Sequence, residues 1–178
     1  MGAGLRPAGK PPDSPPDPTL SRALHFCPDR HKRAFLHTSR MNRQDLQQLS
    51  RLRAREAKAL LDAGNNPGSY YLMGYSVECA IKAAIAKQTQ RHDFPNKRLA
   101  QDSYSHDLKQ LLQTAGMWAN LDAALKTSPP LALNWAVVKD WNETARYVLS
   151  ISDRQARDLY SACTARTHGL LPWLKNYW

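Results

Sequence analysis

The stretch YYLMGYSVECAIKAAIAK, from Tyr70 to Lys87, decides the fold. It is apolar or small on almost every side of a helix, which predicts the central helix of an all-helical bundle. Glu78 and Lys82 nevertheless lie in its middle. A buried carboxylate needs a cationic partner, because its desolvation is costly. The stretch therefore predicts both an all-α fold and a polar contact inside the core.

Two cationic residues are candidate partners for Glu78. Lys82 follows one turn later, a spacing that supplies only about 0.2–0.5 kcal/mol on an exposed helix. Arg146, in the segment WNETARY, carries a planar guanidinium that can make two parallel hydrogen bonds to a carboxylate. We expect a Glu78–Arg146 pair across the bundle, with Glu78, Lys82 and Arg146 as a polar core. The alternative is that Glu78 and Arg146 are polar groups at the edge of the bundle.

Apolar residues spaced three to five apart predict a first helix from Met41 to about Gly64. Further helices are expected over residues 69–87, 105–116 and 118–126, with Ser105 as a helix N-cap. SPPLALN is expected to break the pattern before two terminal helices, over residues 135–148 and 153–174. No segment alternates like a strand, so the predicted fold is an antiparallel bundle of four to five helices.

The first forty residues differ in composition from the rest, since they hold seven of the twelve prolines and no sustained apolar periodicity. Such a segment buries too little surface to offset the entropy of ordering. We expect a disordered leader over residues 1–40 and one helical domain over residues 41–178. Met41 looks like a natural start, so one hypothesis is that the leader is a start-site artefact. Native peptides from upstream of Met41 would refute that hypothesis.

Charge and cysteine content limit the partners and sites to expect. The formal charge is +10, of which residues 1–40 contribute +4 (seven basic, three acidic) and residues 41–178 contribute +6 (eighteen basic, twelve acidic). Cys27, Cys79 and Cys163 lack the spacing of a disulfide framework or a zinc site. No apolar run approaches the length of a membrane span. We expect a cytoplasmic protein with no metal, no cofactor and no membrane contact.

Four segments, in this order, resemble the HEPN domain family: LRAREAKALLDAG, SYYLMGYSVECAIKAAIAK, SHDLKQLL and WNETARY. The second is the most specific, because it combines an aromatic pair, a glycine, a glutamate, a small residue and a lysine. The resemblance implies a helical bundle that is usually dimeric and often encoded beside a nucleotidyltransferase. It also implies a link to toxin–antitoxin systems, since many members are ribonucleases.

Ribonucleases of this family carry an arginine followed, after four to six residues, by a histidine. No pair within residues 41–178 has that spacing, since Arg98 and His106 have seven residues between them and no histidine lies within seven residues after Arg146. We therefore expect a non-catalytic module that forms a homodimer or binds a nucleotidyltransferase-like protein, with RNA or nucleotide as a further ligand. The alternative is a metal-independent ribonuclease with a displaced active site around His106 and Arg146.

Three further features have a functional and a structural interpretation. His106 could contact a phosphate or act as a base, or it could cap a helix and pack beside Tyr104. The C-terminal LLPWLKNYW either docks on its own bundle or supplies a dimer contact. A basic row on the first helix is either a solvated face or an anion-binding face for RNA or nucleotide, although no aromatic residues interleave with it. This row consists of Arg51, Arg53, Arg55 and Lys58.

Overall fold

Helices make up all the regular secondary structure of the described residues, which a computed structural model gives as residue 1, residues 41–89 and residues 96–178. The all-α prediction is confirmed for these residues. The predicted leader lies outside them, apart from Met1. In chain order the elements are α1 (Arg43–Asp62), α2 (Asn66–Gln88), α3 (Lys97–Asp102), α4 (Leu108–Thr114), α5 (Trp118–Thr127), α6 (Pro129–Val138), the 3₁₀ helix η2 (Glu143–Tyr147), α7 (Asp153–Thr164) and α8 (Leu170–Leu174).

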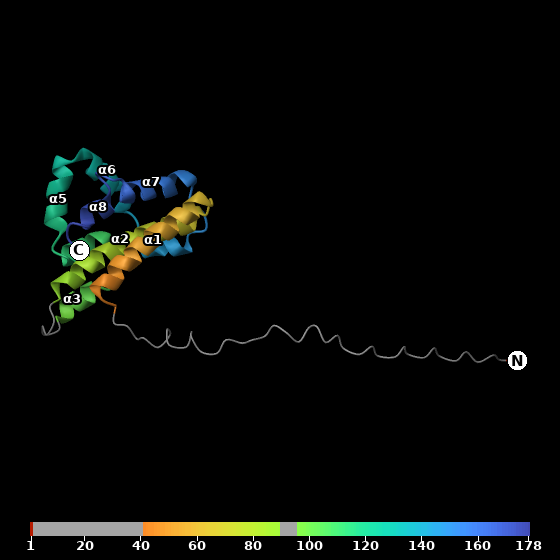
Figure 1. The fold of residues 1–178 in the computed structure, drawn as a ribbon, viewed down its shortest axis with the longest axis horizontal. Helices are drawn as coiled ribbons and strands as arrows, with labels where there is room; N and C mark the ends of the chain where they lie inside the picture. Colours follow the sequence, from red (N-terminus) through yellow and green to blue (C-terminus); the bar gives the residue numbers. More distant parts are fainter. Residues whose placement is uncertain (2–40, 90–95) are drawn as a thin grey trace, which may run out of the picture. The chain divides into compact units, whose positions relative to one another are not determined.

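The helix that contains Glu78, α2, is central to the compact unit formed by Arg40–Trp178. Twelve of its residues are buried, and it packs against α1, α4, α7, α8 and η2. Figure 1 shows α1 lying along α2, with the later helices on the other sides. The prediction of a central helix is therefore confirmed. Its apolar circumference is the physical reason, because each side must bury surface against a neighbour.

Two serine hydroxyls tie α1 to α2 through the main chain. Ser69 Oγ donates a hydrogen bond to the Ala57 carbonyl at 2.8 Å, and Ser76 Oγ donates to the Ser50 carbonyl at 2.7 Å. All four residues are buried. Small side chains at these positions allow the two helices to approach closely, and the hydrogen bonds satisfy the buried hydroxyls.

Two expected helix boundaries are wrong, and only the first of them involves proline. The chain does break between two helices at Ser128, but the next helix does not wait until residue 135: Pro129 already begins α6, where its fixed φ suits the first turn and no main-chain donor is lost. The helix expected over residues 135–148 ends at Val138. Trp141 then occupies the core, and the chain continues as the short η2.

The last expected helix, over residues 153–174, is divided into α7 and α8. Between them the chain turns tightly enough for the Gly169 amide to donate to the Ala165 carbonyl at 2.8 Å. A Cβ at Gly169 would lie 2.4 Å from that same carbonyl oxygen, so the turn requires glycine. After it, α8 buries Leu170, Leu171 and Leu174, and the C-terminal segment docks on its own domain.

None of the described helices is long and apolar enough to cross a bilayer.

Candidate functional site

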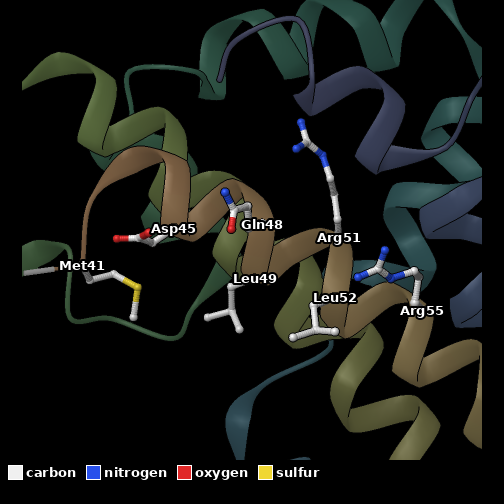
Figure 2. A pocket seen from close by; sticks show the side chains of 7 residues that line it. All are labelled: Met41, Asp45, Gln48, Leu49, Arg51, Leu52 and Arg55. Atoms are coloured by element: carbon white, nitrogen blue, oxygen red, sulfur yellow. The ribbon is translucent and has the colours of Figure 1, made fainter. Parts of the chain in front are cut away.

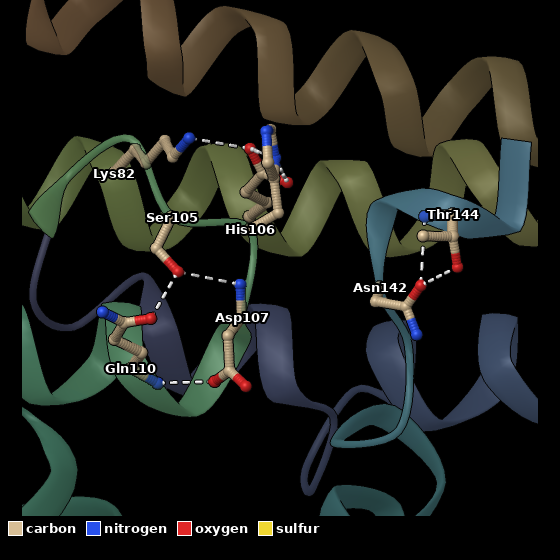
Figure 3. A network of polar contacts seen from close by, with 8 residues as sticks. Lys82, Ser105, His106, Asp107, Gln110, Asn142 and Thr144 are labelled. Atoms are coloured by element: carbon tan, nitrogen blue, oxygen red, sulfur yellow. Dashed lines mark hydrogen bonds and ion pairs between the residues drawn. The ribbon is translucent and has the colours of Figure 1, made fainter.

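Glu78 is the best-buried carboxylate of the described residues, with 1% of its surface exposed. One carboxylate oxygen lies 2.9 Å from Lys82 Nζ, and both lie 3.0 Å from His106 Nδ1. Figure 3 shows Lys82 and His106 converging on this acid from α2 and from the loop before α4. A carboxylate can only accept hydrogen bonds, so His106 Nδ1 is the donor, and in the neutral form of the ring Nε2 carries the lone pair.

The predicted Glu78–Arg146 pair is wrong, whereas the contact between Glu78 and Lys82 is confirmed. Arg146 is exposed and forms no ion pair with Glu78. The cause is Trp141, whose indole lies on Gly74, so closely that a Cβ there would be 2.2 Å from the ring. This contact places the chain just before η2 on α2 at Gly74, one turn before Glu78, and Arg146 interacts with Tyr147 and Tyr71 instead of with the acid.

Arg146 interacts with two tyrosines, Tyr147 and Tyr71. Its Cζ lies 4.9 Å from the centre of the Tyr147 ring. The pKa of Arg146 is raised above its ordinary value, first by the Tyr147 hydroxyl and to a lesser degree by the Tyr71 hydroxyl. Arg146 therefore stays charged, and no carboxylate of the described residues pairs with it.

The tyrosines of α2 extend this arrangement toward α1. Tyr71 and Tyr75, one turn apart, stack with ring centres 6.1 Å apart. Arg53 of α1 places its Cζ 5.8 Å from the Tyr75 ring centre, and it also pairs with Glu56. We call the five residues linked in this way the tyrosine–arginine band. It consists of Arg53, Tyr71, Tyr75, Arg146 and Tyr147.

Sequence reasoning missed this band. Within the first helix no aromatic residue lies among the basic ones. The aromatic partners lie on α2 and η2 and meet Arg53 and Arg146 only through tertiary packing. A detectable signal existed, because Tyr71, Tyr75, Glu78 and Lys82 recur every three to four residues on one face of α2.

His106 precedes α4 but does not cap it. Asp107 is the N-cap, since its carboxylate accepts from the Gln110 amide at 2.7 Å. Ser105, the predicted cap, accepts from the Asp107 amide and donates to the Gln110 side chain (Figure 3). The side chain of His106 is 41% exposed, so part of its ring faces solvent.

The basic row of α1 does not form one face. Arg53 joins the band, and Lys58 pairs with Asp62 at 2.6 Å. Figure 2 shows Arg51 pointing away from Leu49 and Leu52, which lie on the opposite side of α1. Arg51 and Arg55 are both among the residues that line an open depression of about 550 Å³ along α1. The four basic residues therefore serve at least two separate surfaces.

The described cysteines are unsuited to nucleophilic chemistry. Burial raises the pKa of the Cys79 thiol to about 12, and it also raises the pKa of the fully buried Cys163. Thiolate is the reactive form, so both stay unreactive near neutral pH. Across residues 41–89 and 96–178, no three His, Cys, Asp or Glu side chains gather as a metal site would require.

No family model, curated protein or solved structure matches this chain.

Proposed function

We propose that this chain is a non-catalytic helical module of the HEPN type that binds RNA or a nucleotide. It does so as a homodimer or together with a nucleotidyltransferase-like protein. The resemblance of four ordered segments supports the family, and the all-helical structure agrees with it. The buried Glu78, held by Lys82 and His106, then serves to position the loop before α4 on the central helix.

The tyrosine–arginine band is the observation that supports RNA or a nucleotide as the ligand. Tyrosine rings can stack on bases, and arginine can bind phosphate while its plane stacks on an aromatic ring. Arg146 and Tyr147 are exposed, and Tyr147 has 72% of its surface accessible. A single strand of RNA lying along α2 would therefore meet alternating aromatic and cationic groups.

Exposed apolar residues elsewhere on the surface support binding to a second copy or to a protein partner. Leu133 and Val137 are one turn apart on α6 and are 71% and 39% exposed. Leu149, just after η2, is 96% exposed. A protein partner or a second copy that covered them would remove this apolar surface from water.

Truncating either exposed residue of the tyrosine–arginine band, Tyr147 or Arg146, is expected to weaken RNA binding. Tyr147→Ala should lower the affinity for single-stranded RNA roughly tenfold, because stacking on one base contributes about 1–3 kcal/mol. Arg146→Ala should weaken binding and reduce the salt dependence by about one phosphate contact. Fluorescence anisotropy with a labelled oligonucleotide, measured over a range of salt concentrations, gives both quantities.

Lys126→Ala is the matched control for charge. Lys126 lies on α5, its side chain is 74% exposed, and its removal changes the net charge as Arg146→Ala does. We expect it to leave the affinity nearly unchanged. Equal effects of Lys126→Ala and Arg146→Ala would mean that binding follows total charge and not the band, which would refute the proposed interface.

One observation favours the second candidate function, a metal-independent ribonuclease. Glu78 orients His106 so that Nε2 could take a proton, as a general base must. Arg146, however, meets α2 at Tyr71, seven residues and about 10 Å of helix before Glu78. A single phosphate cannot easily contact both groups within one chain, which favours binding over cleavage.

We therefore expect purified protein to leave RNA intact. Total RNA incubated with the protein in the presence of a chelator, and analysed by electrophoresis, should keep its length distribution. The His106→Ala variant provides the comparison. Cleavage by the unchanged protein that disappears in this variant would establish the ribonuclease instead.

A further inference from the structure

A separate pocket lies between α1 and the C-terminal segment, and we call it the C-terminal pocket. Its volume is about 240 Å³. Arg51 and Arg55 line it from α1, while Lys175 and Trp178 line it from the end of the chain. It shares Arg51 and Arg55 with the depression of Figure 2, but its lining outside α1 comes from α7, α8 and the end of the chain. None of its residues belongs to the tyrosine–arginine band.

Three cationic side chains line the pocket without an ion-pair partner in the described part of the chain. Arg51, Arg55 and Lys175 form no ion pair with any carboxylate among residues 41–89 and 96–178, whereas Lys58 on the same helix pairs with Asp62. Three like charges around one small pocket repel each other, and an anion that enters relieves that repulsion. Charge therefore selects an anionic ligand.

The remaining wall selects an aromatic or apolar group beside the anion. Trp178 is half-buried, and Arg51 holds its guanidinium 5.5 Å from the indole centre. Leu171 and Pro172 supply apolar surface next to it. Thr164 already donates its hydroxyl hydrogen to the Tyr160 carbonyl, so its oxygen remains as an acceptor.

We propose that the C-terminal pocket binds one 5′-phosphorylated nucleotide. The phosphate lies against Arg51, Arg55 and Lys175, and the base lies against Trp178 and Pro172. The volume is below the usual range for drug-sized ligands, which limits the site to about one nucleotide. This inference rests on the proposed binding of RNA or nucleotide and names a second place for it. The nucleotide is either free or the 5′ end of an RNA.

Calorimetric titration of the full chain with AMP tests the site. Arg55→Ala and Lys175→Ala should each weaken AMP binding roughly tenfold or more, as expected for loss of a charge-assisted hydrogen bond. Both side chains are exposed, so the variants should fold, and thermal melting verifies this. Lys58→Ala is the matched control, since Lys58 lies on the same helix outside the pocket, and it should bind AMP like the unchanged protein.

Comparing ligands separates the contribution of the phosphate from that of the base, and distinguishes free nucleotides from RNA ends. Adenosine, which lacks the phosphate, should bind at least tenfold more weakly than AMP. Competition for bound AMP by a short RNA with a 5′ phosphate, but not by its 5′-hydroxyl form, would assign the site to RNA ends. Competition by neither RNA would assign it to free nucleotides.

Two results would overturn the proposal: no measurable AMP binding, or an equal loss of affinity in Lys58→Ala. Its failure is distinguishable from that of the proposed function. RNA binding that depends on Arg146 and Tyr147 but persists without AMP binding removes this pocket alone, whereas loss of both activities removes the nucleic-acid function altogether.

Discussion

Gly74→Ala is expected to destabilise the protein by roughly 2–4 kcal/mol. A Cβ at this position would lie 2.2 Å from atoms of the Trp141 indole, far inside van der Waals contact. Trp141 is only 2% exposed, so the ring has no room to yield without leaving the core. Overpacking costs about 1–3 kcal/mol and loss of a buried large side chain about 3–5 kcal/mol, while the helical preference of alanine over glycine returns about 1 kcal/mol.

Urea unfolding followed by circular dichroism measures this loss. Gly68→Ala is the matched control on the same helix, because its Cβ would approach only the end of the Leu60 side chain, at 3.1 Å. We expect it to be neutral or slightly stabilising. In a Trp141→Ala background, Gly74→Ala should cost little, since the clashing ring is gone. An unchanged unfolding midpoint for Gly74→Ala alone would contradict this account of how η2 is anchored.

Glu78→Ala is expected to lower the free energy of unfolding by about 3 kcal/mol. The change leaves Lys82, whose side chain is only 20% exposed, without its carboxylate, and removes the acceptor of His106. Breaking a buried ion pair by deleting one partner typically costs about 3–5 kcal/mol. The long Lys82 side chain can turn partly toward water, which places the expected value at the lower end.

A graded series distinguishes charge from shape. Glu78→Gln keeps the volume and an acceptor, so it should cost less than Glu78→Ala but still leave Lys82 unpaired. Glu56→Ala removes the half-exposed partner of Arg53 and should cost at most about 1 kcal/mol, as surface pairs do. If chemical denaturation gave the same small loss for all three variants, the cluster at Glu78 would contribute nothing particular to stability.

The amino-acid pattern was sufficient for the central helix but not for the contacts of its acid. An apolar circumference from Tyr70 to Lys87 predicts burial on all sides, and Glu78 is buried as expected. Lys82 could be identified because its contact is local. His106 could not be identified as a partner, because its approach depends on where the loop before α4 crosses α2.

The errors at Arg146 and at the late helices share a physical origin. A helix over residues 135–148 would have carried Arg146 along α2, but the chain leaves the helix after Val138 so that Trp141 can fill the space above Gly74. Such a pairing of a large and a small residue is tertiary and leaves no periodic trace. The boundary at Pro129 is different, since proline in a first helical turn is a local rule that could have been applied.

The two serine hydroxyls bound to carbonyls of the neighbouring helix have a mechanical consequence. They prevent α1 from sliding along α2, because any translation would strand a buried hydroxyl without an acceptor. Arg53 projects from α1 toward the tyrosine–arginine band, whereas Arg51 and Arg55 project from the same helix toward the C-terminal pocket. The distances between these arginines along α1 are therefore fixed, whatever occupies either surface.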